Sequence, residues 1–550
     1  MYITPKFIIS CILSGFLLSG ISAFAQTLPP SQPDPPKNWH ALDLKTDGYF
    51  GISLTQAYQF INGLKSKTVV VAIVDSGIDT LQKDLQGVLW VNPKEKAGNG
   101  KDDDHNGYVD DMHGWNFLGG PGGKCDFSET EEEVREYYRL KGKYLNTTEA
   151  SAENKKEYAY WVNVKTEYDS TVTKARTEIV QLSPITNALV ETTGYIRHAL
   201  NLKANQTFTK ADVQKLQTNN DTLKEVKNLW MIAFTDDVSD CTNVKVLKEL
   251  SEYMAKLNNS VNPDLEARKR IVGDDPDVLN DKPYGSNLLK FADASHGTDV
   301  AGIVGAIRNN GYGIDGIADN VKIMAIKAVP IGDEYDKDEV NAIHYAVDNG
   351  AKIINMSFGK KISPHKEWVD EAFKYAAAHD VLLVQAAGNE NQDLDAKPEY
   401  PNDTFADGSA TDADNVISVG ASGMKRDENL ATTFSNFGKK SVDVFAPGVK
   451  ITSIDNDAET ITDDGTSFSA PIVTGIATLI LEYYPDLSAR QIKQAILESA
   501  TPLTGTMVLK PGTKEKVDFA TLSKTGGIVN ARKALEIASK MKGERKNDIN

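Results

Sequence analysis

Long apolar segments and an excess of basic side chains are what this sequence lacks. After its N-terminal stretch, no segment approaches the roughly 20 apolar residues that a membrane-spanning helix needs, so we expect no membrane span in the mature chain. Lysine and arginine number 60 against 77 aspartates and glutamates, a formal net charge of −17. This balance disfavours nucleic acid and anionic membranes as partners. With 40% hydrophobic and 25% charged residues, the composition is typical of a folded globular protein.

Cysteine is scarce as well, with three in 550 residues. Cys11 lies in the apolar N-terminal stretch, which leaves Cys125 and Cys241 for the mature chain. In an exported protein these two could form a disulfide. They could equally be two unrelated thiols, because a sequence does not determine whether their Cα atoms lie within disulfide range.

The N-terminus has the features of an export signal. Lys6 precedes an apolar run over residues 7–18, and Ala23 and Ala25 provide the small residues of a cleavage site. We therefore expect a signal peptide over residues 1–25 and a periplasmic or extracellular protein. A proline-rich leader over residues 26–49 would follow, with an extended and exposed backbone.

Short apolar, β-branched segments alternate with segments of helical period. Strands are expected at residues 69–74, 321–329, 353–356, 381–386 and 416–419, and helices at residues 296–307, 338–349 and 367–378. This order predicts an α/β fold in which helices cover both faces of a parallel β-sheet. Functional groups are then expected at the carboxyl ends of the strands.

Residues 124–285 interrupt this alternation with a charged, glycine-poor segment of helical period. We interpret them as a mainly α-helical insertion that divides the α/β domain into residues 50–123 and 286–540, followed by a polar tail over residues 541–550. The insertion could shield a cleft, dock substrates or hold a dimer, and its apolar stripe could equally form only its own core.

Three short motifs each contain one member of a nucleophile, base and acid set. They are Asp75–Gly77 (DSG), His296–Thr298 (HGT) and Gly465–Pro471 (GTSFSAP). A serine is a weak nucleophile near neutral pH, so it needs a histidine to take its proton and a carboxylate to orient the imidazole. Asp75 also closes an apolar strand, where an unpaired carboxylate would be costly. Together the three motifs predict a catalytic triad of Asp75, His296 and Ser467.

The sequence around these motifs resembles the subtilase family. The resemblance is carried by residues 74–79 (VDSGID), 296–302 (HGTDVAG), 386–389 (AAGN) and 465–471 (GTSFSAP), in family order. It covers roughly residues 50–120 and 285–540. It implies a subtilisin-like α/β fold, interrupted by the helical insertion, and a secreted serine endopeptidase that acts on proteins or peptides.

The resemblance also implies roles for single residues. Ser467 would attack the peptide carbonyl, His296 would carry the proton to the leaving amine and Asp75 would orient His296. The side-chain amide of Asn389 would stabilise the oxyanion together with the Ser467 backbone N–H.

Two further segments resemble the substrate-binding strands of the family. Ser357, Phe358 and Gly359 would form one wall of the specificity pocket, and Ala386, Ala387 and Gly388 the other. Extended peptides bind such edges through main-chain hydrogen bonds, which provide affinity without selecting a sequence. The preferred side chain, the natural substrate and the oligomeric state stay open at this stage.

An acidic segment supplies oxygen ligands at alternate positions. Asp102, Asp104, Asn106 and Asp110 surround the turn residue Gly107, as in the first part of a calcium-binding loop. We expect calcium here as a structural ion. The glutamate that would close an EF-hand is absent, so the ligand set would need completing elsewhere, and a solvated acidic turn is the alternative.

Two rival functions belong to other classes. A catalytically silent scaffold could present the insertion to a partner, although the presence of all four catalytic residue types argues against it. An esterase could use the same side chains, but the Gly-x-Ser-x-Gly turn of that class does not surround Ser467.

Overall fold

The computed structural model describes residues 35–234, 242–280, 283–291, 294–409, 412–456 and 460–545. Its chain divides into two compact units. The sheet unit comprises residues 36–127 and 265–545, and the helical unit comprises residues 128–264. The expected signal peptide (1–25), Cys241 and the last five residues of the polar tail lie outside the described residues, so the proposed disulfide and the domain boundaries stay predictions.

A sheet of nine strands forms the centre of the sheet unit, in the order β12-β15-β9-β8-β7-β6-β1-β5-β2. Every neighbouring pair is parallel except β12 and β15. The strands are β1 (Val69–Asp75), β2 (Gly114–Asn116), β5 (Val321–Lys327), β6 (Ile353–Met356), β7 (Leu382–Ala386), β8 (Val416–Ser422), β9 (Val444–Pro447), β12 (Thr501–Pro502) and β15 (Gly527–Ile528).

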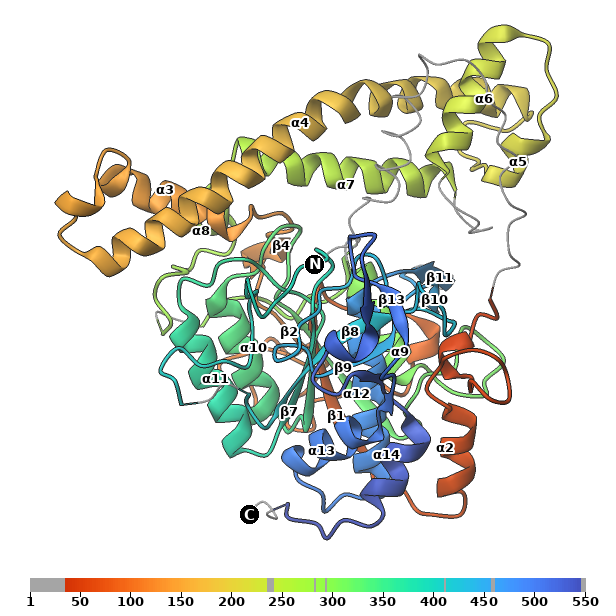
Figure 1. Ribbon diagram of the computed structural model, residues 1–550. Coiled ribbons are helices and arrows are strands. Elements are labelled where there is room, and N and C mark those ends of the chain that lie inside the picture. Colours follow the sequence, from red (N-terminus) through yellow and green to blue (C-terminus); the bar gives the residue numbers. More distant parts are fainter. Residues whose placement is uncertain are drawn as a thin grey trace. The chain divides into compact units, whose positions relative to one another are not determined.

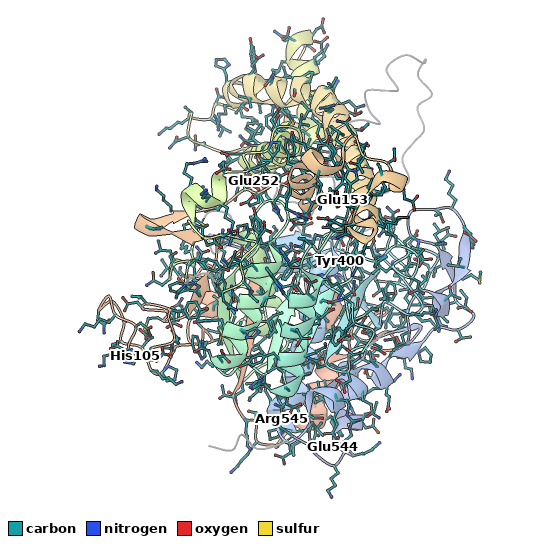
Figure 2. All side chains as sticks on the ribbon, turned by 90° about the vertical axis from the view of Figure 1, so that its left-hand side faces the viewer. His105, Glu153, Glu252, Tyr400, Glu544 and Arg545 are labelled. Carbon is teal, nitrogen blue, oxygen red and sulfur yellow. The ribbon has the colours of Figure 1, made fainter. Side chains whose placement is uncertain are left out.

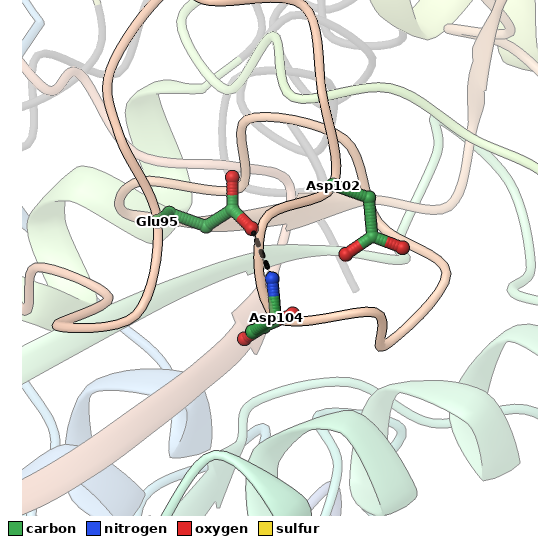
Figure 3. Close-up of side chains that lie close together, drawn as sticks. All are labelled: Glu95, Asp102 and Asp104. Carbon is green, nitrogen blue, oxygen red and sulfur yellow. Dashed lines mark hydrogen bonds between the residues drawn. The ribbon is translucent and has the colours of Figure 1, made fainter.

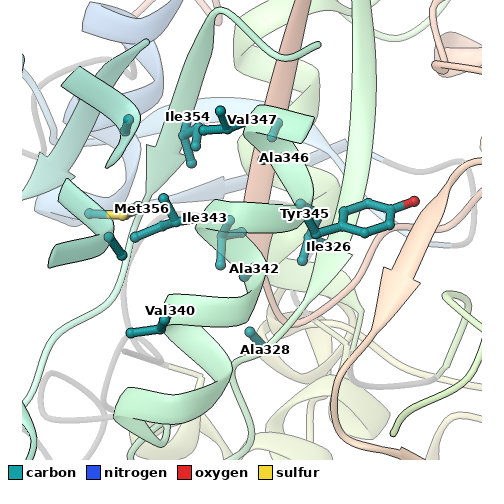
Figure 4. Close-up of a cluster of buried hydrophobic side chains, with 14 of the residues drawn as sticks. Ile326, Ala328, Val340, Ala342, Ile343, Tyr345, Ala346, Val347, Ile354 and Met356 are labelled. Atoms are coloured by element: carbon teal, nitrogen blue, oxygen red, sulfur yellow. The ribbon is translucent and has the colours of Figure 1, made fainter. Parts of the chain in front are cut away.

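Helices cover both faces of this sheet (Figure 1). One face carries α10 (Asp336–Asp348) and α11 (Lys366–Ala378), and the other carries α9 (Ser295–Gly305) and α12 (Thr466–Tyr483). Side chains of α10 pack on those of β5 and β6 in a buried apolar cluster (Figure 4). Because both faces are covered, the strands are apolar at nearly every position rather than alternating.

The predicted α/β fold is confirmed. The five expected strands correspond to β1 and β5 to β8, and the three expected helices to α9 to α11, with ends that differ by at most three residues. The strands β2, β9, β12 and β15 were not predicted, because they have only two to four residues each and therefore carry no period of their own.

Smaller elements complete the sheet unit. They are α2 (Leu54–Ile61), α8 (Ala267–Ile271), α13 (Ala489–Ser499), α14 (Ala531–Ala538), the strand pairs β3 (Gly119–Gly120) with β4 (Lys124–Cys125), β10 (Ile451–Ile454) with β11 (Thr460–Asp463) and β13 (Met507–Leu509) with β14 (Lys516–Asp518), and the 3-10 turns η1 (Trp39–Ala41), η2 (Lys83–Leu85), η3 (Pro121–Gly123) and η5 (Phe519–Thr521).

Part of the expected leader packs on the sheet unit. Trp39 is fully buried, and its Nε1–H donates to the carbonyls of Val449 (3.0 Å) and Lys450 (3.1 Å). The backbone N–H of Ile52 donates to the carbonyl of His40 at 2.8 Å. This stretch is therefore held by specific contacts rather than extended into solvent.

The helical unit consists of α3 (Glu132–Tyr144), η4 (Glu149–Ser151), α4 (Lys155–Ala199), α5 (Lys210–Lys215), α6 (Asp221–Ala233) and α7 (Asn243–Val261). Asn154 caps the N-terminus of the 45-residue α4, and its side chain accepts from the N–H of Glu157. Its buried positions, such as Trp161, Val164 and Leu182, follow the helical period of the sequence. Of the helices that the structure describes, none is both long and apolar enough to span a bilayer.

Candidate active site

Asp75 and His296 meet at the carboxyl end of β1. Asp75 is the last residue of that strand, and His296 stands in the first turn of α9. The Nδ1 atom of His296 lies 2.7 Å from Oδ1 of Asp75, and both side chains are buried. Burial alone would raise the pKa of the Asp75 carboxyl, but the charge and hydrogen bond of His296 outweigh it and lower this pKa below its usual value. The aspartate is therefore ionised beside the imidazole.

The close approach of α9 to β1 depends on Gly297. A Cβ atom at this position would lie 2.1 Å from the carbonyl oxygen of Gly77 and 3.2 Å from Cβ of Asp75. The N–H of Gly297 instead donates to Oγ of Ser76 at 3.2 Å. The glycine after the histidine thus allows the two segments to touch, which brings Asp75 and His296 into contact.

Ser467 is the second residue of α12. Its Oγ is buried and makes no hydrogen bond to the part of the chain that the structure describes. The ring of the next residue, Phe468, lies 6.2 Å from the imidazole of His296 in an edge-to-face arrangement. The start of α12 therefore lies against the pair of Asp75 and His296, where the first N–H groups of the helix favour negative charge.

A proline in α12 leaves one carbonyl of the helix without its usual donor. Pro471 has no N–H, so the carbonyl of Ser467, four residues earlier, lacks an intrahelical partner. The buried hydroxyl of Ser357 donates to this carbonyl at 3.0 Å and in turn accepts from Nδ2 of Asn355 at 2.9 Å. Residues after β6 thus hold the backbone of the predicted nucleophile.

Asn389 follows β7 and is oriented by Thr466. Its side-chain carbonyl accepts from both the N–H and the hydroxyl of Thr466, each at 2.9 Å. The Thr466 hydroxyl accepts in turn from the N–H of Gly388 at 3.1 Å. These two hydrogen bonds fix the orientation of the Asn389 side chain, so its Nδ2 is the atom that can donate to another group. No local pattern predicts this role of Thr466, because its hydroxyl bonds to a residue 77 positions away.

The two predicted substrate-binding segments lie at the carboxyl ends of two neighbouring strands of the sheet, β6 and β7. In the first segment the side chains of Ser357 and Phe358 are buried. Backbone groups and the partly exposed Gly359 are therefore what this segment can offer to a substrate. On the other side Ala387 is buried and Ala386 is partly exposed. Gly388 has a φ of +104°, which favours glycine.

Acidic side chains gather at a loop of the sheet unit that includes Glu95, Asp102 and Asp104 (Figure 3). One ligand oxygen from each lies within 4.8 Å of the others. Oε1 of Glu95 accepts from the N–H of Asp103 (2.7 Å) and of Asp104 (3.2 Å), whereas its buried Oε2 makes no hydrogen bond to any described residue. This orphaned oxygen fits a hard cation such as calcium. Glu95 was not among the predicted ligands, because it precedes the acidic pattern in the sequence.

The other two predicted metal ligands have different partners. Nδ2 of Asn106 donates to carboxylate oxygens of Asp104 and Asp111, each at 3.3 Å. The carboxylate of Asp110 accepts from the N–H groups of Asn99 (3.1 Å) and Gly100 (2.7 Å). The same loop extends outward to the exposed His105, labelled in Figure 2. The structure thus groups Asp102 and Asp104 with Glu95, while Asp110 anchors the loop backbone.

The chain is similar to known proteins over most of the sheet unit. The sequence model of the Subtilase family matches residues 66–520. A thermophilic serine proteinase of Bacillus sp. (strain AK1) is 36% identical over 38% of this chain and 48% of its own length. Subtilisin DY of Bacillus licheniformis is 36% identical over 38% of this chain and 71% of its own length. The chain thus spans about half the length of the first of these relatives.

Among solved structures, the A-subunit of the AB5 toxin from E. coli matches with a TM-score of 0.38 and 25% identity, over 46% of this chain and 81% of that one. The family match covers far more than half of the sequence, and it includes all four motifs on which the resemblance depends. The chain therefore belongs to the subtilase family of serine peptidases.

Proposed function

We propose that this protein is an exported serine endopeptidase that hydrolyses peptide bonds in proteins through Asp75, His296 and Ser467. The observation that carries the proposal is the buried 2.7 Å contact between His296 and Asp75 at the end of the central strand. An ionised carboxylate accepts a hydrogen bond from Nδ1–H, so it favours the tautomer with the proton on Nδ1. In this tautomer Nε2 carries no proton and can accept one from a serine.

The reaction would proceed in two halves. Oγ of Ser467 attacks the carbonyl carbon of the peptide, and its proton passes to His296. His296 then protonates the leaving nitrogen as the C–N bond breaks, which leaves an acyl group on Ser467. A water molecule then loses a proton to His296 and attacks the ester carbon. The bond from this carbon to Oγ of Ser467 breaks, Oγ takes the proton back from His296, and the acid is released. Asp75 stays ionised throughout and stabilises the imidazolium.

Negative charge on the carbonyl oxygen would be stabilised by two donors. These are the backbone N–H of Ser467, in the first turn of α12, and the side-chain amide of Asn389. The hydrogen bonds from Thr466 support this assignment, because they restrain Asn389 before the substrate arrives. A donor that needs no reorganisation stabilises the transition state more effectively.

Calcium is the ion we propose for the acidic loop, with Glu95, Asp102 and Asp104 as ligands. Bound there, it would supply structural stabilisation and no chemistry. Export rests on the N-terminal signal features of the sequence, and we retain residues 124–285 as an insertion into the peptidase domain.

Casein hydrolysis by the purified mature chain tests the function. We expect activity in the wild type, loss with a serine-directed fluorophosphonate, and loss in Ser467→Ala. Mass spectrometry of the labelled protein should place the phosphonate on Ser467. If the folded wild type neither cleaves casein nor reacts with the fluorophosphonate, the chain is a silent scaffold and the proposal is wrong.

A further inference from the structure

Two glutamates meet beside the segment that follows β7. Nδ2 of Asn436 donates to Oε2 of Glu390 at 3.0 Å and to Oε2 of Glu399 at 3.1 Å. The same nitrogen donates to the carbonyl of Ala387 at 2.9 Å. One amide thus ties both carboxyl groups to the backbone of a predicted substrate-binding segment.

This carboxyl pair touches one predicted wall of the specificity pocket, and the segment that carries Glu399 is hydrogen-bonded next to the other wall. A Cβ atom on Gly388 would lie 2.7 Å from Oε2 of each glutamate, so the pair is in contact with the second wall. Tyr400, next to Glu399, exchanges two backbone hydrogen bonds (2.7 and 2.8 Å) with Lys360, next to Gly359 in the first wall. Figure 2 labels Tyr400 within the sheet unit. The Glu399 segment therefore joins the two walls.

Lys360, which follows the first wall, is paired with another carboxylate. Nζ of Lys360 is already 2.7 Å from Oδ1 of Asp336 and donates to the carbonyl of Glu334 at 2.8 Å. Burial, followed by the charge and hydrogen bond of Glu390, raises the pKa of Glu399 well above its usual value, although Lys361 acts in the opposite direction. The protonated form of Glu399 is therefore favoured while no cation is bound beside it.

We propose that Glu390 and Glu399 make this peptidase select substrates with lysine or arginine before the scissile bond. The inference rests on the proposed function. In a peptidase of this kind, the substrate side chain before the scissile bond enters the pocket between the two predicted walls. An ammonium or guanidinium group would displace the proton of Glu399 and form charge-assisted hydrogen bonds to both carboxylates. An apolar side chain would offer the two carboxyl groups no new partner and would remove them from water. Both glutamates are partly exposed, so a side chain can reach them.

A matched pair of peptide substrates tests the proposal. The two peptides differ only in arginine or leucine before the scissile bond, and the measurement is the ratio of their kcat/KM values. Because both are hydrolysed by one preparation, the ratio does not depend on its folded fraction. We expect the wild type to prefer arginine by roughly 10- to 100-fold, as for a hydrogen bond to a buried charge. Glu399→Gln, which keeps the shape and loses the charge, should lower the ratio by most of that factor, and Glu390→Gln should lower it as well.

The control is Glu428→Gln, which removes the same charge from an exposed residue that pairs with Lys516. It should leave the ratio unchanged. Efficient hydrolysis of the leucine peptide without preference for arginine, or an unchanged ratio in Glu399→Gln, would overturn the inference while the peptidase function stands. Hydrolysis of neither peptide, together with no labelling of Ser467, would remove the proposed function and the inference with it.

Discussion

The hydroxyl of Ser357 donates a 3.0 Å hydrogen bond to the backbone carbonyl of Ser467, which Pro471 leaves without an intrahelical donor. Two residues 110 positions apart are thus joined at the first turn of α12. The nucleophile is positioned through its backbone, so its hydroxyl remains available for the chemistry. Ser357 is in this respect a positioning residue.

Ser357→Ala should destabilise the protein by about 1–3 kcal/mol, because the buried carbonyl of Ser467 then lacks any donor. Pro471→Ala supplies a new N–H for that carbonyl, so the same Ser357→Ala change should cost clearly less in this second background. Urea unfolding of the four proteins measures the coupling. The measurements belong in a Ser467→Ala background, where unfolded molecules are not digested. Additive effects of the two substitutions would show that the Ser357 hydroxyl does not serve this carbonyl.

The stability of the sheet unit should fall as pH rises, because of Glu482 near the end of α12. Burial and the neighbouring carboxylate of Asp319 raise the pKa of Glu482 from 4.5 to about 9. Below pH 4.5 both folded and unfolded chains hold this proton. Between about pH 4.5 and 9 the unfolded chain loses it while the folded chain retains it, so stability declines over this window.

Glu482→Gln reproduces the protonated form and should remove this decline. We expect the variant to match the parent protein near pH 4.5 and to unfold at a higher urea concentration at pH 8.5. The exposed Glu428→Gln serves as the control for the charge change. An equal pH dependence in the parent and in Glu482→Gln would contradict the prediction.

Calcium should raise the unfolding temperature, and chelation should lower it. At a calcium concentration 100 times the dissociation constant, linkage gives about 2.7 kcal/mol of stabilisation. Glu95→Gln should weaken calcium binding at least roughly tenfold, because a charged ligand of a hard cation is lost. Asp110→Asn should leave the affinity nearly unchanged, since its oxygens accept backbone N–H groups. Calorimetric titration with calcium measures the affinity of both variants. If Asp110→Asn weakens binding more than Glu95→Gln does, the ligand set predicted from the sequence is favoured instead.

The segment that follows the helical unit is anchored by Arg268. Its guanidinium is buried and hydrogen-bonds both carboxylate oxygens of Asp338 (2.6 and 2.8 Å) and both of Asp274 (2.9 and 2.8 Å). Arg268→Ala should destabilise the protein by about 3 kcal/mol, because two buried carboxylates lose their bidentate partner. Asp274 keeps Lys337 at 2.9 Å, and Asp338 keeps the hydroxyl of Tyr284 at 2.7 Å. Arg268→Lys should restore little, since an ammonium cannot make these bidentate contacts.

Arg532→Ala is the control, because this partly exposed arginine pairs with Glu536 within one helix at 3.2 Å. It should cost at most about 1 kcal/mol. Urea unfolding in the Ser467→Ala background compares the variants. An equal loss of unfolding free energy in Arg268→Ala and Arg532→Ala would mean that the buried network does not anchor the segment after the helical unit.

Local patterns in the sequence determined the elements of the sheet and the types of the catalytic residues. Continuous β-branched runs and helical periods depend only on neighbouring residues, so β1, β5 to β8 and α9 to α11 could be predicted within three residues. The motifs around Asp75, His296 and Ser467 are likewise short and contiguous.

Only the tertiary structure decided which distant groups share a partner. The hydrogen bonds from Ser357 to Ser467 and from Thr466 to Asn389 join residues 110 and 77 positions apart. Glu95 and Glu399 have no local signal, because a carboxylate acquires its role from the groups that burial brings beside it. Parallel strands meet only after long crossovers, so the contacts at their carboxyl ends are set by the order of strands in the sheet.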